Sequence, residues 1–515
     1  MKPIDPQVWK QDLPAFREKT AAFYAGEVDK GAYKGFSGFY GSYAQKGGKA
    51  SMLRLRMPAG RVTPDKLAFV AKAIRSYAVP RVHFTTCQTI QLHDLQPDAL
   101  FAIMEGALDC GIIVIGGGGD YPRNVMCSPL SGIEADEYFD VLPWAEAAGE
   151  YLLHFIKAEK MPRKLKVGFS SSPANLTHAT YRDLGFAARP DGTFDVYSAG
   201  GLGNNPRFGV KVAEKVAPEK ILYYIKAMWL TFRAYGNYEN RGKARTRYMQ
   251  DVCGGPDGYA KAFLEKLDEV VASGEDLDLA LSPHAVSKAG DGSSACGPRV
   301  IAQKQPGLYA VAWHPLGGQA DPQTLCRVSD LLGVMPDVEM RLSPDQGAVI
   351  VNLTGAEAEK VLESTADGAR TLFETSVSCI GGATCQVGMR DSQGLLLKCI
   401  DAVRRAGIPD GALPQIYVSG CPSSCGTHQT GVIGFRGASR MVDGKPQSAF
   451  SLFSGGVSRQ GAEAMGREVG VLLESDIPRF LVSLGQTVAA SGKDFSAWLA
   501  ACPDGVDAAA QPFLG

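Results

Sequence analysis

Four of the twelve cysteines occur as two close pairs, an arrangement that can bring several thiolates to one metal centre. The first pair lies in CIGGATC and comprises Cys379 and Cys385, and the second lies in CPSSCG and comprises Cys421 and Cys425. Glycines between the first two cysteines remove side-chain bulk, and Pro422 stiffens the turn between the second two. Because cluster irons take thiolate ligands, the pattern favours an iron–sulfur cluster. Structural zinc, whose cysteine pairs usually enclose roughly two to four residues, and a chance grouping are the alternatives.

Basic side chains form a second pattern, because several lie inside apolar or glycine-rich stretches rather than in charged runs. Arg54 and the arginine two residues later alternate on a strand-like run and therefore share one face. Lys164 and Lys166 share a strand face in the same way, and Arg123 follows a glycine-rich turn in GGGGDYPRN. Any one of these residues alone is usually a solvated surface group. Their shared context predicts a local concentration of positive charge that could bind an anion.

Two further arginines, Arg241 and Arg245, are four residues apart in ENRGKARTRY. If this segment is helical, both side chains could hold one anion from a single face. The histidines carry less information, because a lone histidine near a motif is more often a hydrogen-bonded structural residue than a metal ligand. We therefore assign none of them to a metal.

The composition is that of a soluble globular protein with several domains. The chain has 515 residues, of which 45% are hydrophobic and 21% charged. Its 53 basic and 54 acidic residues nearly cancel, so no global charge draws the chain to nucleic acid or to a membrane surface. The N-terminus lacks the apolar core of a secretory signal, and no apolar run reaches the roughly 18–20 residues that span a bilayer. We expect a cytoplasmic protein with no membrane span and no nucleic-acid partner.

An internally repeated fold must position these groups. In each half, a turn is followed by a helical run, strand-like residues and a second helical run. The segments are 66–77, 82–92 and 97–109 in the first half and 323–332, 338–353 and 356–365 in the second. This duplication of a βαββ-like unit predicts an α+β protein with two pseudo-symmetric halves. The expected division is an N-terminal arm at 1–49 and four domains at 50–115, 116–290, 291–366 and 367–515.

Together, the motifs resemble those of the siroheme- and 4Fe–4S-containing sulfite/nitrite reductase family over residues 38–495. Besides the cysteine pairs, they are SMLRLRMPAG (51–60), FTTCQTIQLHDL (84–95), DYPRNVMCSP (120–129), PRKLKVGF (162–169), GGLG (200–203) and NRGKARTRY (240–248). The resemblance implies duplicated halves around a central siroheme. Domains 50–115 and 291–366 would be ferredoxin-like half-domains. Domains 116–290 and 367–515 would be mixed α/β-sheet domains that bind the siroheme and the cluster.

The resemblance also implies roles for individual residues. The cluster ligands would be Cys379, Cys385, Cys421 and Cys425, with Cys425 shared with the siroheme iron. Four basic residues would bind the substrate anion and deliver protons: Arg54, Arg123, Lys164 and Lys166. The siroheme carboxylates would be held by Thr85, Gln91, Arg163, Arg241, Arg245 and Gln346.

Two positions depart from the family pattern, which often has arginine where this chain has His83 and Cys87. The loss of two arginines leaves siroheme carboxylates less neutralised. An amidated siroheme, a compensating base elsewhere such as Arg81, or a shifted function could follow from this difference. Cys87 itself could be a reactive thiol or a plain small residue.

The resemblance implies an enzyme that reduces sulfite to sulfide with six electrons, because Lys166 matches the sulfite-reducing form of the pocket. Reduction of nitrite to ammonia is the alternative. A tetrapyrrole-biosynthesis enzyme and a non-catalytic redox sensor are less favoured, because neither needs the anion pocket. One 4Fe–4S cluster per chain is expected, since the other eight cysteines are not grouped. No flavin or nicotinamide domain is recognisable, so the electrons would come from a separate donor protein, either a ferredoxin or a flavoprotein.

Overall fold

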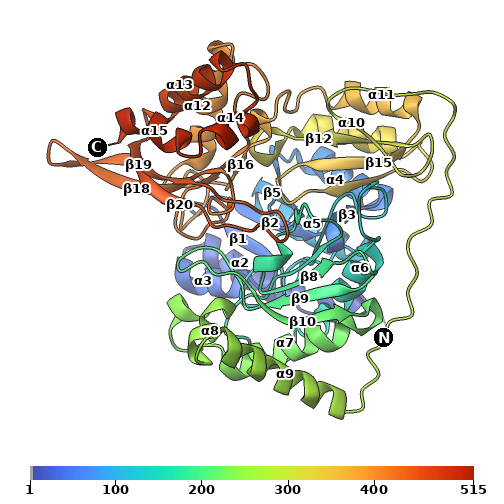
Figure 1. Ribbon diagram of the computed structural model, residues 1–515. Coiled ribbons are helices and arrows are strands. Elements are labelled where there is room, and N and C mark those ends of the chain that lie inside the picture. The colour runs from blue at the N-terminus through green and yellow to red at the C-terminus, as the bar shows by residue number, and fades with distance from the viewer. Residues whose placement is uncertain (1–3, 515) are drawn as a thin grey trace.

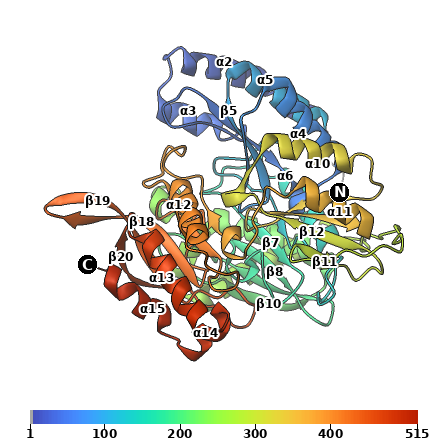
Figure 2. The ribbon, with the colours of Figure 1, turned by 90° about the horizontal axis from the view of Figure 1, so that it is seen from above.

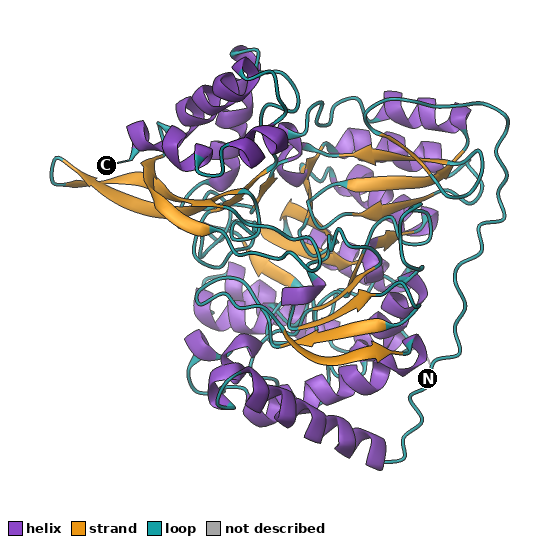
Figure 3. Cartoon of the chain, viewed as in Figure 1, coloured by secondary structure: helices purple, strands orange, loops and turns teal. Residues whose placement is uncertain are grey.

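The strands of the protein form four five-stranded sheets in two related pairs (Figure 1). The computed structural model describes residues 4–514. In one pair, each sheet belongs to a single half of the chain; in the other, each sheet takes one edge strand from the opposite half. Helices pack on the sheets (Figure 3). This arrangement confirms the predicted α+β fold with duplicated halves.

The first pair of sheets builds two ferredoxin-like units that exchange an edge strand. The first sheet has the order β1 (Ser42–Ala44), β2 (Ser51–Arg56), β5 (Thr89–Leu95), β4 (Arg81–Phe84) and β13 (Gln319–Ala320). The second has the order β11 (Val300–Ala302), β12 (Tyr309–Trp313), β15 (Ala348–Leu353), β14 (Glu339–Leu342) and β3 (Arg61–Val62). Because β3 pairs with β14 and β13 pairs with β4, each half completes the other's sheet. The two units also share one hydrophobic core.

Helices lie on these sheets where amphipathic runs predict them. They are α4 (Pro64–Tyr77) and α5 (Pro97–Asp109) in the first unit, and α10 (Pro322–Leu332) and α11 (Gly355–Ser364) in the second. Proline is tolerated at the start of α4 and α10 because an N–H there has no partner within the helix. The strand expected over 82–92 is instead a hairpin, in which β4 and β5 are separated by a turn that contains Gln88 at φ +52°.

The second pair of sheets repeats one mixed pattern of strand directions. In both sheets the first three strands are parallel and the last two pairings are antiparallel. The first sheet contains β6 (Met126–Cys127), β7 (Val167–Ser170), β8 (Leu184–Ala188), β9 (Phe194–Ser198) and β10 (Val210–Val216). The second contains β16 (Val377–Ser378), β17 (Ile416–Ser419), β18 (Ile433–Val442), β19 (Lys445–Ser454) and β20 (Arg467–Leu473). Each sheet has its own hydrophobic core.

The helices of these two domains complete their cores. The first domain has α6 (Leu142–Leu153), α7 (Ile221–Tyr235), α8 (Met249–Val252) and α9 (Pro256–Ala272). The second has α12 (Ser392–Arg405), α13 (Ile477–Ala490), α14 (Phe495–Ala501) and α15 (Gly505–Ala510). No helix in residues 4–514 is long and apolar enough to cross a bilayer. The domain boundaries given above stay a prediction.

The N-terminal helices and one long connection lie outside the repeat. Helices α1 (Gln7–Lys10) and α2 (Leu13–Tyr24) pack on α5, and α3 (Lys30–Ser37) lies beside α2 (Figure 2). Trp9, Leu13 and Phe16 join the core that the ferredoxin-like units share. Residues 273–299 form no helix or strand and run along the outside of the molecule from α9 to β11 (Figure 1).

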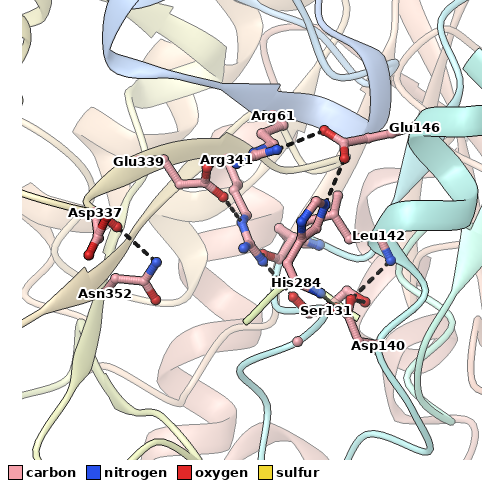
Figure 4. Close-up of polar contacts among 12 residues, drawn as sticks. Arg61, Ser131, Asp140, Leu142, Glu146, His284, Asp337, Glu339, Arg341 and Asn352 are labelled. Atoms are coloured by element: carbon pink, nitrogen blue, oxygen red, sulfur yellow. Dashed lines mark hydrogen bonds and ion pairs between the residues drawn. The ribbon is translucent and has the colours of Figure 1, made fainter. Parts of the chain in front are cut away.

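A polar network joins the two halves beside this connection (Figure 4). Arg61 on β3 donates from Nε to Glu339 on β14 at 2.6 Å and from Nη1 to Glu146 on α6 at 3.2 Å. Arg341 donates from Nε to the other oxygen of Glu339 at 2.8 Å, and His284 of the connection contacts Glu146 at 2.8 Å. Burial raises the pKa of Glu339, but the charges of Arg341 and Arg61 outweigh it and hold this pKa below its ordinary value.

We expect Arg341→Ala to destabilise the protein, because it removes a buried partner of the Glu339 carboxylate. The Arg341 side chain is 5% exposed, and it also donates to the carbonyl of Ser131. Breaking such a buried ion pair costs about 3–5 kcal/mol of the free energy of unfolding. Thermal unfolding followed by circular dichroism measures this effect. The control is Arg405→Ala, which breaks an exposed pair with Asp401 and should cost less than about 1 kcal/mol. Equal melting temperatures for the two variants would contradict the prediction.

Candidate functional site

Two arginines and a glycine-rich loop form one wall of the site. Arg54 lies on β2, and Arg123 lies at the end of the loop 115–123. Arg123 donates to the carbonyl oxygens of Gly117 and Gly119, both at 2.7 Å, and Arg54 donates to the same Gly117 oxygen. Burial and the neighbouring charge of Arg54 lower the pKa of Arg123 to about 10. Two like charges held this close together attract an anion.

Backbone contacts fix this wall in place. Arg56 on β2 is buried and donates to three carbonyl oxygens of the loop, those of Ile115, Pro122 and Arg123. Gly118 allows the loop to approach its neighbour, since a Cβ there would lie 2.6 Å from the carbonyl oxygen of Gly38. The conformation of the loop, and with it the position of Arg123, is therefore set by Arg56 and by close backbone packing.

Lys164 and Lys166 lie on an extended segment beside the same loop. Leu165, between them, forms a parallel bridge to the loop, and its carbonyl accepts a hydrogen bond from the Arg123 N–H at 2.8 Å. Burial and three neighbouring positive charges hold the pKa of Lys164 well below the ordinary lysine value. Because Arg123 and Lys166 are two of those three charges, the four basic residues singled out in the sequence belong to one electrostatic cluster.

The cysteine pairs follow two neighbouring parallel strands and so meet at one edge of a sheet. Cys379 comes directly after β16, and the turn that contains Cys421 and Cys425 follows β17. The Cys379 N–H donates to the carbonyl of Val418 at 3.0 Å, and the Gly420 N–H donates to the Cys379 sulfur at 3.2 Å. Hydrogen bonds to sulfur are among the contacts that tune iron–sulfur centres.

Glycine is required where the two cysteine turns touch their surroundings. A Cβ on Gly426 would lie 2.1 Å from the carbonyl oxygen of Val418, and one on Gly420 would lie 2.4 Å from that of Arg390. The four thiols thus come from two closely packed turns, a donor set that fits an iron–sulfur cluster. Within residues 4–514, no three His, Cys, Asp or Glu side chains converge on a position for a single metal ion.

The charges of both the basic residues and the other paired cysteines act on Cys425. Burial raises the pKa of its thiol, the charges of Lys164 and Lys166 lower it, and two other cysteines raise it further. The thiol therefore feels both groups of side chains. Thr86, in the turn between β4 and β5, donates from Oγ1 to the Cys425 carbonyl at 3.0 Å, which joins the first half of the chain to the second at this point.

Three guanidinium groups of the site have unused donors. The atoms Arg123 Nε, Arg182 Nη2 and Arg245 Nε are buried and have no hydrogen-bond partner within the described part of the chain. Buried donors are costly when they remain unsatisfied. An anionic group with several carboxylates, such as siroheme, would satisfy donors of this kind.

The arginines expected to hold carboxylates are already paired with acidic side chains. Arg163 and Arg241 both contact Asp120, with Arg241 Nη1 at 2.7 Å from Oδ2, and Arg245 contacts Asp183 at 2.9 Å. The prediction that Arg241 and Arg245 share a helix face is wrong. Separate 3-10 turns cover 241–243 and 246–248, and Arg245 has extended backbone between them.

Thr85, Gln91 and Gln346 contact neighbouring protein groups. The Thr85 hydroxyl is hydrogen-bonded at 2.7 Å to the hydroxyl of Thr89, the first residue of β5. Gln346 exchanges two hydrogen bonds with the backbone of Ser378, both at 2.8 Å. The Gln91 oxygen, in the amide orientation that satisfies both neighbours, accepts from Arg54 Nη2 at 2.6 Å. Their role toward a cofactor stays a prediction.

Sequence reasoning missed the two acidic residues that organise the site. Asp120 follows the glycine run, and Asp183 precedes β8 in YRDLG. Asp183 is fully buried and accepts from the Lys166 N–H at 2.8 Å as well as from Arg245 and Thr246. Burial raises the pKa of Asp183, but these partners outweigh it and lower the pKa below its ordinary value of 3.8. No local pattern announces such residues, because their partners are distant in the chain.

We expect Asp183→Asn to destabilise the protein by about 3–5 kcal/mol, since it leaves the Arg245 charge without its buried partner. Because the folded-state pKa of Asp183 is lowered, its contribution is present above pH 3.8 and is lost as the pH falls through the folded-state pKa. The difference in melting temperature between variant and wild type should therefore be full at pH 7 and shrink in acid. A difference that does not depend on pH would contradict this account.

His83 and Arg81 do not replace the missing positive charge. Burial, together with the charges of Arg81 and Arg54, lowers the pKa of His83 to about 3, so its ring is neutral near pH 7. The Arg81 guanidinium contacts Asp94 through Nε at 3.1 Å and donates to Thr384 at 2.9 Å. All three guanidinium nitrogens of Arg81 thus have partners within the protein.

Cys87 has an ionisable thiol in a positive environment. Burial raises the pKa of this thiol, but the charges of Lys166 and Arg182 and a hydrogen bond from Lys166 outweigh burial and lower the pKa to about 6. The thiolate form therefore predominates at neutral pH. Its negative charge offsets part of the positive charge around it.

Two family models match the chain. Residues 43–109 match the nitrite/sulfite reductase ferredoxin-like half domain, and residues 118–268 match the nitrite and sulphite reductase 4Fe-4S domain. The paired cysteines lie outside both matched ranges, in the second half of the duplicated fold. The matches thus cover the first copy of each repeated unit.

Named relatives cover most of the chain. The ferredoxin–nitrite reductase of Synechococcus elongatus is 27% identical over 79% of this chain and 80% of its own length. The chloroplastic ferredoxin–nitrite reductase of Spinacia oleracea is 27% identical over 79% of this chain and 69% of its own length. The assimilatory ferredoxin-dependent nitrite reductase of Haloferax mediterranei is 25% identical over 98% of this chain and 92% of its own length. The Mycobacterium tuberculosis NirA protein structure, at 22% identity, superposes with a TM-score of 0.77 over 98% of both chains and shows the same fold.

Proposed function

The chain belongs to the nitrite and sulphite reductase family, and we propose that this oxidoreductase reduces nitrite to ammonia with electrons from ferredoxin. The observation that carries the proposal is that the thiol of Cys425 is influenced both by the charges of Lys164 and Lys166 and by two other paired cysteines. A thiolate shared there would connect an electron store directly to the substrate site. The three relatives reported above are named as ferredoxin-dependent nitrite reductases, which supports the choice of substrate and donor.

The sulfite preference predicted from Lys166 is corrected by these relatives, which are named for nitrite. The structure supplies a physical reason why Lys166 is a poor indicator of substrate charge. Its ammonium group acts on the Cys87 thiol, whose pKa is lowered to about 6. With the thiolate present, the net charge of this part of the site is lower than the lysine alone indicates, and a monoanion such as nitrite needs less positive charge than a dianion.

Two groups would complete the site. One 4Fe–4S cluster would be held by Cys379, Cys385, Cys421 and Cys425. A siroheme would be held by Arg245, which has a buried donor without a partner among the described residues, and by Arg163 and Arg241, which would share their guanidinium groups between Asp120 and a siroheme carboxylate. When bound, the two groups would pass electrons one at a time from ferredoxin to the anion, six in all, for the reaction NO2− + 8H+ + 6e− → NH4+ + 2H2O. The convergence of basic residues supports this proposal over a non-catalytic redox sensor, which needs no anion site.

The chain's own residues bind the anion and deliver protons. Arg54 and Arg123, which both donate to the Gly117 carbonyl of the glycine-rich loop, would orient nitrite through charge-assisted hydrogen bonds. Lys164 would donate protons, because its lowered pKa makes proton release easier near neutral pH than from an ordinary lysine. Asp183 positions Lys166 through its backbone N–H.

Anaerobic purification followed by absorption spectroscopy and turnover tests the proposal. We expect siroheme bands, iron and labile sulfide for one cluster and one siroheme per chain, and nitrite consumption driven by reduced ferredoxin. Sulfite, offered under the same conditions, should be reduced more slowly. A protein that contains no siroheme, or that consumes sulfite but not nitrite, would contradict the proposal.

A further inference from the structure

Arg182 is a buried arginine that the proposed reaction does not use. It lies between a 3-10 turn (Ala179–Tyr181) and β8, and the residue is only 7% exposed. Its Nε donates to the carbonyl of Thr177 at 2.7 Å, and the side chain runs past Gly168, where a Cβ would lie 3.5 Å from Arg182 Cγ. The guanidinium is therefore fixed in one orientation.

One end of this guanidinium has no partner. Nη2 is buried and makes no hydrogen bond within residues 4–514. The neighbouring acid, Asp183, is engaged by Arg245 and Thr246. A buried guanidinium is strongly unfavourable unless an anion pairs with it and its donors are satisfied.

The surroundings of Arg182 carry excess positive charge. The positive charges of Lys166, Arg182 and Arg54 all act on Cys87. The Cys87 thiolate supplies a single negative charge against these three. Arg81, which lies on the adjacent β4, is bound by Asp94. Asp183 also acts on Arg182, but the buried Nη2 of Arg182 still has no partner in the part of the chain that the structure describes, so this corner can accept a further anion.

Building on the proposed siroheme enzyme, we propose that Arg182 binds a carboxylate of the tetrapyrrole, in the corner where the short Cys87 side chain stands in place of an arginine. The planar guanidinium matches a carboxylate through two parallel hydrogen bonds. A resident cofactor satisfies the buried charge throughout the catalytic cycle, whereas a substrate would leave it unpaired between turnovers. Of the three possibilities that the sequence left open, this one is a compensating base, with Arg182 in the place suggested for Arg81.

The test is the retention of siroheme by the holoenzyme. Wild type, Arg182→Gln and Arg182→Lys are purified anaerobically, and the loss of siroheme to an excess of a haem-binding acceptor is followed by absorbance. We expect Arg182→Gln to lose siroheme about tenfold faster or more, the effect of removing a charge-assisted hydrogen bond. Arg182→Lys keeps the positive charge but cannot make two parallel hydrogen bonds, so its rate of siroheme loss should lie between those of the wild type and Arg182→Gln. Labile-sulfide content and melting temperature report whether each variant is folded.

Moving the charge gives a second, independent test. Cys87→Arg alone places two guanidinium groups in one corner and should not improve retention. The double variant Cys87→Arg/Arg182→Gln should hold siroheme better than Arg182→Gln, because one arginine again serves the carboxylate. Non-additivity of this kind is expected only for groups that share a partner.

The outcomes separate this inference from the proposed function. A wild type that purifies without siroheme contradicts both. A siroheme-containing wild type whose Arg182→Gln variant keeps siroheme at the wild-type rate overturns this inference alone. An Arg182→Gln variant that keeps siroheme but shows a raised KM for nitrite also overturns it, because Arg182 would then bind substrate. Failure of the double variant to improve on Arg182→Gln contradicts the placement of the carboxylate beside Cys87.

Discussion

Cys421→Ser is expected to purify without labile sulfide and with a disturbed structure in the turn that contains Cys421 and Cys425. Ligation energy is part of the folding energy of metal sites, so the loss of one thiolate costs more than a side-chain contact. The two cysteine turns contact each other directly through the hydrogen bond from Gly420 to Cys379, so disorder in one turn reaches the other. Iron and sulfide analysis of the purified variant measures the effect.

The matched control is Cys253→Ser. Cys253, like Cys421, is partly exposed, and it lies at the end of α8, far along the chain from either pair. It should retain full iron and sulfide. Full cluster content in Cys421→Ser, or equal loss in both variants, would contradict the assignment of the paired cysteines.

Lys164→Gln is expected to reduce kcat/KM for nitrite by about 10²–10⁴-fold, the usual contribution of a positioned proton donor. The wild-type rate should also fall on the alkaline side at a pH below the ordinary lysine value of 10.5, because the ammonium form is lost as pH rises through the lowered pKa. The variant should lack this alkaline limb. Steady-state rates from pH 6 to pH 10 with a reduced viologen donor measure both effects.

The exposed Lys160→Gln is the control for the loss of one positive charge near the same segment. It should leave kcat/KM and its pH profile unchanged. Siroheme and cluster content must be equal in both variants, so that the rate reports chemistry rather than occupancy. A Lys164→Gln enzyme with the wild-type alkaline limb would exclude Lys164 as the titrating group.

Local patterns predicted the helices well, because α4, α5, α10 and α11 each combine an apolar face with a proline-marked or capped start. The exchange of β3 and β13 could not be predicted, since each strand has two residues and pairs across half the chain. A two-residue strand carries no periodic signal, and only the packing of the two units on one core brings it to its partner.

In the candidate site, too, features with a local pattern could be predicted and long-range partners could not. The types and contexts of Arg123 and Lys164 pointed to an anion site, and the structure places both in one cluster. The partners Asp120 and Asp183 were missed, because each meets its arginine only after the sheets have formed. The sulfite preference predicted from Lys166 is wrong against the relatives, which are named for nitrite, and no local pattern indicated that the charge of Lys166 acts on Cys87.

The most direct test of the account is the yield of ammonium per nitrite. The anaerobically purified holoenzyme is mixed with reduced ferredoxin and a known amount of nitrite, and ammonium and residual nitrite are measured over time. We expect one ammonium for each nitrite consumed, with six electrons taken from reduced ferredoxin, and faster turnover than with sulfite. Absence of ammonium while sulfite is converted to sulfide by the same preparation would contradict it.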